Sequence, residues 1–521
     1  MWKILPTPSS SLHIHSTMSY GTVLSELFGF EHFRPGQLDV IQNVLDRDLD
    51  TVGILPTSTG KTLIFQLITA VKRRVDPAGI TLIVSPLIAL MQDQVRSCNA
   101  LLTLDSDGCI IGGGGQKDVA TMLGSAQNDP DADRDAMMGR YPLVYVSPEK
   151  LPFLPSKLLS RVFLLVVDEC HCVSEHGNSF RPAYRKIRSY LPGVRTLALT
   201  ATTTAAMEAD IVDNLAMEQP VVVRTSMYRK NLHLSVRSKQ TRDKDMEVIR
   251  SALPTEGRTV VFAPTRLDCE RLARVLGSRA RYYHAGLSPA ERCDVMAEFV
   301  DGSILVATNC FGLGVDIPDI RFVVHYGLPR SILGYVQECG RAGRDGHNAT
   351  CLLFEDASDI AKYTETERDV KSATAMFAWT RQTRCRHQSL LEMFGEAMTS
   401  SCCWGTTDHP GCDTCLGEIA ESIVTTTTDD TLLLLTAMKE TGNYSGRRLP
   451  VDFLLGSKSK KLTRFRNLHK SSVYAQGRHH SRETWIAIHR QLVDLKAIRE
   501  VVTTRGYVVF KTTADVCPKM Y

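Results

Sequence analysis

Residues 51–72, TVGILPTSTGKTLIFQLITAVK, combine the signals of a strand, a loop and a helix. The stretch opens with a short apolar run at 51–55, continues through Pro56-Thr57-Ser58-Thr59-Gly60-Lys61-Thr62 and ends in a pattern typical of a helix at 63–72. A strand that runs into a helix through such a loop turns backbone N–H groups and the N-terminus of the helix toward one anion. The stretch therefore predicts a phosphate site at the end of a β-strand.

The loop carries two side chains suited to a nucleoside triphosphate. Lys61 is placed to reach the β- and γ-phosphates of ATP, and the hydroxyl of Thr62 is placed to bind Mg²⁺. Leu55 stands where the complete phosphate-loop motif has its first glycine, so Gly-Lys-Thr by itself is a weak signal. The other expected ATP-binding residues of the loop are Thr57, Ser58, Thr59 and Gly60.

An acidic pair strengthens this interpretation. Asp168 and Glu169 come directly after a second apolar run at 164–167. The C-terminal ends of buried parallel strands are where α/β sheets bind ligands. We therefore expect Asp168 to hold the Mg²⁺ and Glu169 to orient and deprotonate the attacking water. A solvated acidic pair at a strand end is the alternative, which the upstream Gly-Lys-Thr disfavours.

Short apolar runs alternate with helical patterns along most of the chain. Near-continuous apolar runs are typical of strands that are buried on both faces of a parallel sheet. The pattern predicts an α/β fold with two parallel-sheet lobes, residues 20–225 and 226–365. The expected strands include residues 82–84, 143–146, 164–167, 196–199, 259–262, 304–307, 322–324 and 351–354.

The composition is that of an ordinary globular protein. A chain of 521 residues is too long for one core and predicts about three or four domains. No stretch approaches the roughly 20 apolar residues of a membrane-spanning helix, so no membrane partner is expected. Residues 1–19 are rich in Ser, Thr and Pro and lack the pattern of a targeting signal, which predicts a disordered tail.

Charge and glycine content are less informative. The net charge of +4 does not by itself indicate a polyanionic partner. Residues 458–482 contain eight Lys and Arg and no acidic residue, a run that suits either a solvated surface or contact with nucleic acid. The glycine run at 112–115 lacks a following Lys-Ser or Lys-Thr, and the Asp-rich residues 129–135 predict a flexible insertion.

Many of the 15 cysteines lie inside apolar runs. This distribution is typical of buried free thiols in a reducing intracellular compartment and not of a disulfide scaffold. The cysteines between 385 and 415 are an exception, because Cys412-Asp413-Thr414-Cys415 can place two thiolates on one ion. We expect a structural Zn²⁺ site. Its expected ligands are Cys385, Cys403, Cys412 and Cys415, with Cys402 and His409 as alternatives.

Further segments belong to a recognisable set of motifs. They are residues 28–30 with 33–37, 84–95, 145–151 and 199–202 in the first lobe, and 283–287, 307–316 and 337–346 in the second. With the phosphate loop and the acidic pair, they resemble the motifs of the RecQ helicases of superfamily 2, over residues 24–510. The resemblance implies two RecA-like lobes and an ATP-dependent 3′→5′ DNA helicase of repair, recombination or replication. It implies a nuclear protein in a eukaryote and a cytoplasmic one in a prokaryote.

The resemblance also assigns roles to individual residues. Gln37 would read the adenine edge, with Arg34 and Gln337 helping to hold the nucleotide. Arg341 and Arg344 lie three positions apart, a spacing that puts both on one face of a helix. There they could stabilise charge that develops on the γ-phosphate. The residues expected to contact DNA or to couple DNA to the nucleotide site include Ser85, His171 and Thr308.

Two positions depart from the family pattern. Ser58 stands where the family has glycine, which costs about 1 kcal/mol or more if the backbone there needs a positive φ. His176 stands where the family usually has tryptophan in an aromatic-rich loop that couples DNA binding to hydrolysis. The smaller stacking face of His176 predicts weaker coupling. The other residues of that loop that match the family are Phe180, Arg181 and Tyr184.

The last part of the chain resembles the RecQ C-terminal winged helix. We expect a zinc-binding helical subdomain at 366–424 and a winged-helix domain at 425–521, with helices at 430–440 and 485–492 and a hairpin at 497–510. Arg482 opens the second helix, where it could meet a phosphate. In the family the hairpin tip can separate strands, which implies that role for Arg505 and Tyr507. A winged helix that binds only a partner protein is the alternative.

These predictions favour an ATP-dependent DNA helicase that binds single-stranded and duplex DNA, with ATP, Mg²⁺ and structural Zn²⁺ as cofactors; protein partners are not indicated. A DNA-binding scaffold with impaired hydrolysis is the alternative that Ser58 and His176 motivate. An RNA remodeller is disfavoured by the zinc and winged-helix segments. DNA-stimulated ATP turnover would distinguish a motor from a scaffold.

Overall fold

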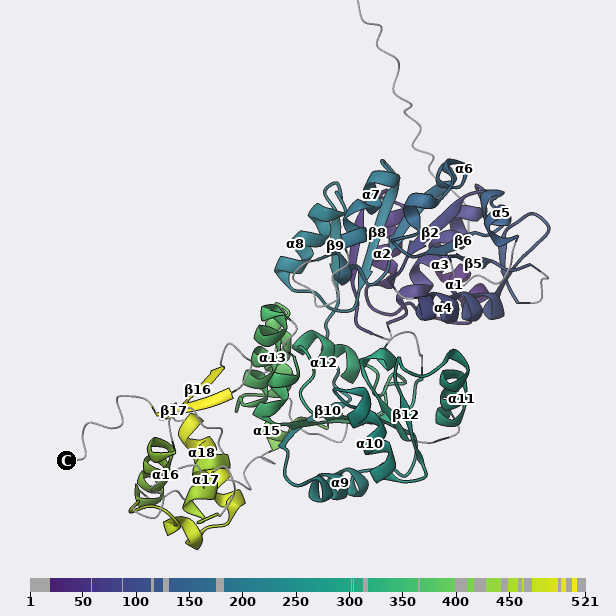
Figure 1. Ribbon diagram of the computed structural model, residues 1–521. Coiled ribbons are helices and arrows are strands. Elements are labelled where there is room, and N and C mark those ends of the chain that lie inside the picture. Colours follow the sequence, from purple (N-terminus) through teal and green to yellow (C-terminus); the bar gives the residue numbers. More distant parts are fainter. Residues whose placement is uncertain are drawn as a thin grey trace, which may run out of the picture. The chain divides into compact units, whose positions relative to one another are not determined.

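In a computed structural model, the chain divides into two compact units, Met1–Ser226 and Met227–Tyr521 (Figure 1). The structure describes residues 19–57, 59–86, 88–113, 117–124, 131–174, 182–300, 302, 304–312, 317–363, 366–398, 410–416, 428–441, 448–457, 462, 471–494, 498–502 and 508–512. Within these ranges, no helix is both long enough and apolar enough to cross a membrane.

The first unit is built on a seven-stranded sheet in the order β5-β6-β2-β7-β8-β1-β9. Neighbouring strands pair in parallel, as the apolar runs predicted. Both faces are buried, since Leu82 and Val84 of β2 belong to one core cluster and Ile83 to another. The strands are β1 (Thr51–Ile54), β2 (Ile80–Val84), β5 (Ala120–Leu123), β6 (Leu143–Val146), β7 (Val162–Val167), β8 (Arg195–Thr200) and β9 (Val221–Arg224).

Helices supply the core on both faces of this sheet. The cluster that contains Ile83 also takes residues from α1 (Tyr20–Phe28), α2 (Gln37–Leu45), α3 (Lys61–Arg73) and α4 (Ile88–Leu101). The opposite cluster takes residues from α6 (Ser156–Leu159), α7 (Ile187–Tyr190) and α8 (Ala205–Asn214). The unit also contains a hairpin of β3 (Leu102–Leu104) and β4 (Ile110–Gly112), and the short 3₁₀ helices η1 (Leu151–Phe153), η2 (Cys170–Val173) and η3 (Pro182–Lys186).

The prediction of a flexible insertion at 129–135 is wrong for its second half. Helix α5 (Ala132–Met137) forms there. Ala132 and Ala136 are fully buried, so two small apolar residues four positions apart anchor one face of a helix that also carries three charged residues. The sequence pattern was dominated by the aspartates and concealed this apolar pair.

The second unit begins with a six-stranded parallel sheet in the order β10-β15-β14-β11-β13-β12. Val260 and Val261 of β11 again belong to different core clusters. Its strands are β10 (Leu232–Ser238), β11 (Arg258–Phe262), β12 (Ala280–Tyr283), β13 (Ile304–Ala307), β14 (Ile320–Tyr326) and β15 (Ala349–Glu355). Its helices are α9 (Arg242–Ser251), α10 (Arg266–Leu276), α11 (Pro289–Val300), α12 (Ile332–Cys339), η4 (Asn309–Gly312) and η5 (Ala357–Lys362).

The helices that follow this sheet extend the same core. Met376 and Trp379 of α13 (Glu367–Thr380) pack in one cluster with the strands, and the Trp379 ring lies 5.1 Å from that of Tyr335. The region expected to bind zinc is therefore attached to the second sheet through a common hydrophobic core. It continues through α14 (Arg386–Met393) and α15 (Asp413–Leu416).

A separate core, centred on the fully buried Trp485 and including Phe453, holds the C-terminal elements together. They are α16 (Thr428–Glu440), α17 (Arg448–Leu454), η8 (Gln476–His479), α18 (Arg482–Asp494) and an antiparallel hairpin of β16 (Ile498–Val502) and β17 (Val508–Thr512). Three helices followed by a two-stranded wing form the winged helix that the sequence predicted.

Candidate nucleotide and zinc sites

The start of helix α3 is shaped to bind an anion. Gly60 has φ +74° and directly precedes the first helical residue, Lys61. Gly60 has no side chain to cap the helix, and the first turn of α3 contains no acidic residue. The backbone N–H groups at this end can therefore serve a bound phosphate. Both the amide N and Oγ1 of Thr59 donate to the Pro56 carbonyl, at 3.2 and 2.7 Å, which fixes the loop; Ser58 lies outside the described residues.

Gln37 links the predicted adenine motif to this loop. Its side chain is buried, and its Nε2 donates to the carbonyls of Thr59 at 2.8 Å and Gly60 at 3.1 Å. Its Oε1 accepts from the backbone N–H of Arg34 at 2.8 Å. The structure thus brings Gln37 and the loop together, although it reveals a loop-holding contact that the sequence did not predict.

Lys61 and the acidic residue Asp168 complete the polar centre of the unit. Nζ of Lys61 donates to the carbonyls of Leu55 at 3.1 Å and Pro56 at 3.4 Å. Asp168 follows β7 and is nearly inaccessible to solvent. Burial and the neighbouring Glu169 raise the pKa of Asp168 to about 6, while Lys61 and a hydrogen bond from Gln94 oppose the rise. A buried carboxyl that is costly to ionise alone suits a cation, so the donor set fits Mg²⁺.

Glu169 is held by its backbone and by a neighbouring histidine. Its φ of +50° is unusual for a residue with a side chain and costs about 1–2 kcal/mol. Nδ1 of His171 lies 3.2 Å from Oε2 of Glu169 and 3.1 Å from Oγ1 of Thr200. Burial alone would lower the pKa of His171, but contacts with Cys172 and Glu169 outweigh it and raise the pKa to about 10. His171 therefore connects the acidic pair to the end of β8.

The other expected DNA-coupling residues have varied positions. Ser85 and Tyr184 are fully buried, and Tyr184 packs in the core beside β7. Their side chains therefore lie beneath the surface of the first unit, and their role in coupling stays a prediction. In the second unit, Thr308 is nearly buried and donates to Sγ of Cys310 at 3.2 Å. The rest of the predicted aromatic-rich loop, His176, Phe180 and Arg181, lies outside the described residues.

The prediction that Arg341 and Arg344 share a helical face is wrong. Helix α12 ends at Cys339, and both arginines lie on the turns that follow it. Gly343 has φ +53°, and a Cβ there would come within 2.5 Å of the Nδ2 of Asn231, so the turn between the two arginines requires a glycine and cannot be helical. Gln337 remains on the last turn of α12.

Two residues that the sequence did not single out hold this turn. Arg229 donates through Nη2 to the carbonyls of Ala342 and Gly343, both at 2.8 Å. Asn231 donates through Nδ2 to the carbonyl of Gly343 at 2.9 Å. Both lie in an irregular segment before β10, where no periodic pattern could have indicated them.

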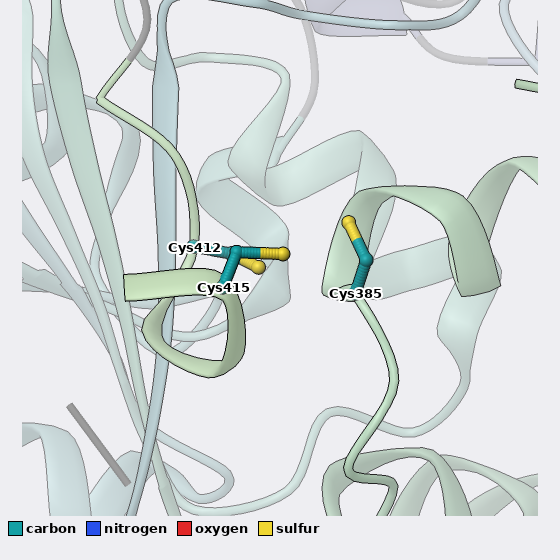
Figure 2. Close-up of side chains that lie close together, drawn as sticks. All are labelled: Cys385, Cys412 and Cys415. Carbon is teal, nitrogen blue, oxygen red and sulfur yellow. The ribbon is translucent and has the colours of Figure 1, made fainter. Parts of the chain in front are cut away.

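The expected zinc ligands converge in the second unit. The Sγ atoms of Cys385, Cys412 and Cys415 all lie within 4.8 Å of one another, and their side chains point toward a common space (Figure 2). The backbone N–H of Arg386 donates to Sγ of Cys412 at 3.4 Å, as suits a thiolate ligand. The donor set fits Zn²⁺. The fourth expected ligand, Cys403, and the alternatives Cys402 and His409 lie outside the described residues.

A buried ion pair fixes the zinc segment to the sheet. Nε of Arg386 donates to Oδ1 of Asp413 at 3.0 Å, and both side chains are almost fully buried. Oδ2 of Asp413 also accepts from the backbone N–H of Val236 in β10 at 2.8 Å. The residues beside the cysteines therefore orient the ligands from both sides.

In the winged helix, Arg482 begins α18 as predicted, and it forms an ion pair with Asp452. Ser481 precedes it, and its Oγ accepts from the Thr484 N–H at 3.1 Å. Arg505 and Tyr507 lie outside the described residues.

The fold and the first site together define a nucleotide-dependent motor with two RecA-like lobes. Four family models match in order: DEAD/DEAH box helicase at 34–210, helicase conserved C-terminal domain at 244–346, RecQ zinc-binding at 348–416 and RQC domain at 424–517. Among solved structures, Dbp5 of S. cerevisiae bound to RNA and ADP BeF3 has a TM-score of 0.53 at 17% identity, covering 71% of this chain and 90% of that one. That likeness concerns the fold alone.

Relatives that align with most of this chain indicate its family more specifically than the fold does. The ATP-dependent DNA helicase RecQ of Haemophilus influenzae is 30% identical over 92% of this chain and 76% of its own. A putative ATP-dependent DNA helicase Q1 of Caenorhabditis elegans is 33% identical, over 85% and 72%. A putative ATP-dependent RNA helicase R290 of Acanthamoeba polyphaga mimivirus is 30% identical, over 93% and 88%. The chain belongs to the RecQ family of superfamily 2 and is an ATP-dependent helicase.

Proposed function

We propose that this protein is a DNA helicase that moves 3′→5′ and unwinds duplex or structured DNA in repair, recombination or replication. The proposal is carried by the combination of a nucleotide site with a winged helix in one chain. The nucleotide site consists of the uncapped N-terminus of α3 and the buried Asp168, and both lie in the first unit. This site suits ATP hydrolysis, and the winged helix suits a duplex. The DNA helicases among the relatives support the same substrate.

Several residues of the first unit have separate roles in ATP hydrolysis. Lys61 and the N–H groups of α3 bind the phosphates, and Glu169 holds and deprotonates the attacking water. Thr62 and Asp168 would hold Mg²⁺, which would neutralise charge on the phosphates. Gln37 can exchange its hydrogen bonds with the loop for bonds to the adenine, because its amide offers both a donor and an acceptor.

The second unit contributes the arginine turn, which is the segment after α12 that carries Arg341 and Arg344. Arg229 and Asn231 bind its carbonyl groups and so fix the backbone that carries Arg341 and Arg344. Guanidinium groups on a rigid backbone need little reorganisation when charge develops on a phosphate. We infer that this turn supplies the arginine pair of the hydrolytic reaction, and that Arg34 and Gln337 assist nucleotide binding.

Strand displacement tests the proposal. The substrates are DNA duplexes with a single-stranded tail at the 3′ or the 5′ end, and a matching RNA duplex. We expect ATP-dependent displacement from the 3′-tailed DNA and none by the Lys61→Ala variant. Displacement from the 5′-tailed DNA alone would overturn the direction. DNA binding without displacement or ATP turnover would favour the scaffold, and preference for RNA would favour a remodeller.

A further inference from the structure

A second cluster of metal-ligating side chains lies in the winged helix. Asp430, His479 and His480 each offer a ligand atom, and these atoms all lie within 4.8 Å of one another. Oδ1 of Asp430 is 2.9 Å from Nε2 of His479, and Oδ2 is 3.2 Å from Nε2 of His480. The cluster contains no cysteine and shares no residue with the thiols of Figure 2.

The cluster joins the start of α16 to the end of η8, and α18 packs against it. Asp430 lies in the first turn of α16 and is buried. Ala475 precedes η8 with φ +62°, an unusual conformation that redirects the chain before the histidines. His479 ends η8 and His480 is extended, with φ −114° and ψ +152°, so that two consecutive imidazoles reach the same carboxylate. Trp485 of α18 packs edge-on against both rings, at 5.6 and 5.2 Å.

The proton positions favour a cation between these groups. Nδ1 of His479 lies 3.0 Å from the Gln476 carbonyl, which can only accept, so Nδ1 carries the proton. In the neutral imidazole, Nε2 of His479 then presents a lone pair to the carboxylate of Asp430. Nε2 of His480 is buried and makes no hydrogen bond within the described part of the chain. In this tautomer the Nε2 lone pair of His479 faces an anionic carboxylate, and a metal ion bound between the groups relieves that repulsion.

The chemistry of the donors selects the kind of metal. Two imidazoles with one carboxylate suit Zn²⁺, whereas Mg²⁺ and Ca²⁺ prefer oxygen ligands alone. The ligand atoms of the three residues lie within 4.8 Å of one another, so small side-chain shifts bring them to the spacing of about 3.3 Å that neighbouring ligands have in a tetrahedral zinc site with bonds of about 2.0 Å. The Gln476 carbonyl plays the part of an outer hydrogen-bond acceptor that orients a zinc-binding imidazole.

We propose that Asp430, His479 and His480 form a second zinc site, in addition to the cysteine site. The His479 side chain is 47% exposed, which leaves an approach for water as the remaining ligand. The ion fastens the start of α16 to the turn that leads into α18, two elements 49 residues apart in sequence. It would thereby stabilise the winged helix in the way that structural zinc stabilises small domains.

Metal analysis of the full chain tests the proposal without ATP or DNA, so its failure is distinguishable from failure of the helicase activity. We expect two zinc ions per wild-type chain after removal of loosely bound metal. The variant H479A/H480A should keep one, and Cys412→Ser should lose the other. The matched control is H32A/H347A, which removes two exposed imidazoles and should keep both ions. One ion in both the wild type and H479A/H480A would overturn the proposal.

A spectroscopic measurement covers the case in which a variant does not fold. Co²⁺ added to wild-type protein stripped of its non-cysteine metal should quench the fluorescence of Trp485, because both imidazoles touch its ring. The quenching should disappear in Trp485→Phe and in the conservative H479N/H480N variant, with the circular dichroism of the latter unchanged. Equal quenching in H479N/H480N, or no quenching in the wild type, would show that the two histidines bind no metal ion and would overturn the proposal.

Discussion

The two parallel sheets of this protein can be compared where a strand runs into a helix. In the first unit, β1 leads to α3, whose N-terminus follows Gly60 and has no acidic residue in its first turn. In the second unit, β11 leads to α10, where the hydroxyl of Thr265 accepts from the Asp268 N–H and Asp268 adds a negative charge. One helix end is left for a phosphate and the other is satisfied from within. The residues at the start of each helix therefore distinguish the nucleotide loop from an ordinary strand-to-helix connection.

The largest effect is expected from Lys61→Ala, which removes the lysine of the nucleotide loop in the first unit. Loss of a positive charge at the phosphates should lower kcat for ATP by roughly 10²- to 10³-fold. Steady-state ATP hydrolysis with saturating single-stranded DNA measures the effect. Lys244→Ala, on an exposed position of α9 in the second unit, should leave kcat unchanged. Normal turnover by Lys61→Ala would place the nucleotide elsewhere.

Arg229→Met tests the contribution of the second unit. The variant loses the charged hydrogen bonds to the carbonyls of Ala342 and Gly343, which are worth about 1.5–3 kcal/mol. If that free energy positions the arginines in the transition state, kcat should fall roughly 10- to 100-fold. ATP affinity should stay near that of the wild type, because the phosphates are bound in the first unit. Equilibrium binding of an ATP analogue and kcat separate the two effects. Arg237→Met, on an exposed position of β10, is the control; a weaker affinity at normal kcat would contradict the account.

A matched pair of glycines sharpens the comparison further. Gly60 (φ +74°) and Gly277 (φ +98°) both adopt backbone conformations that cost about 1 kcal/mol or more with a side chain. A Cβ at Gly60 would lie 2.7 Å from Nε2 of Gln37, whereas one at Gly277 meets nothing within 4 Å. Gly60→Ala should therefore weaken ATP binding about tenfold, and Gly277→Ala should lower only the stability. Calorimetric titration with an ATP analogue, with thermal unfolding, measures both. Equal affinities would show that the loop tolerates displacement of Gln37.

The smallest effect is expected from Thr265→Ala. The loss of an N-cap should cost about 1 kcal/mol of stability, seen as a lower midpoint in urea. ATP affinity should not change, because this helix end serves no phosphate. A drop in ATP affinity as large as that of Gly60→Ala would remove the distinction between the two helices.

The regular parts of the fold could be predicted because their signals are local. Apolar runs such as the one at β7 mark strands buried on both faces, and the winged helix follows from short helical patterns and a hairpin. Gly60, Lys61 and Asp168 could be found because they border predicted strands and helices. The turn after α12 could not, because Gly343 breaks a helical spacing and its support comes from Asn231, 112 positions away.

Contacts between residues far apart in the sequence explain the other features that could not be predicted. Burial of Tyr184 depends on the core beside β7, and no periodic pattern surrounds it. His479 and His480 belong to the basic run at 458–482, which suggested a solvated surface or contact with nucleic acid. Their partner Asp430 comes from the start of another helix. In each case the chemical character of the side chains could be read from the sequence. Which side chains contact one another could not be predicted, because tertiary packing determines it.

DNA-stimulated ATP hydrolysis by the wild-type chain tests the central claim most directly. We expect single-stranded DNA to raise ATP turnover, because the open end of α3 and the acidic pair form a working hydrolytic site. Turnover that stays at background, with DNA and the ATP analogue both bound normally, would contradict this claim and leave a DNA-binding scaffold.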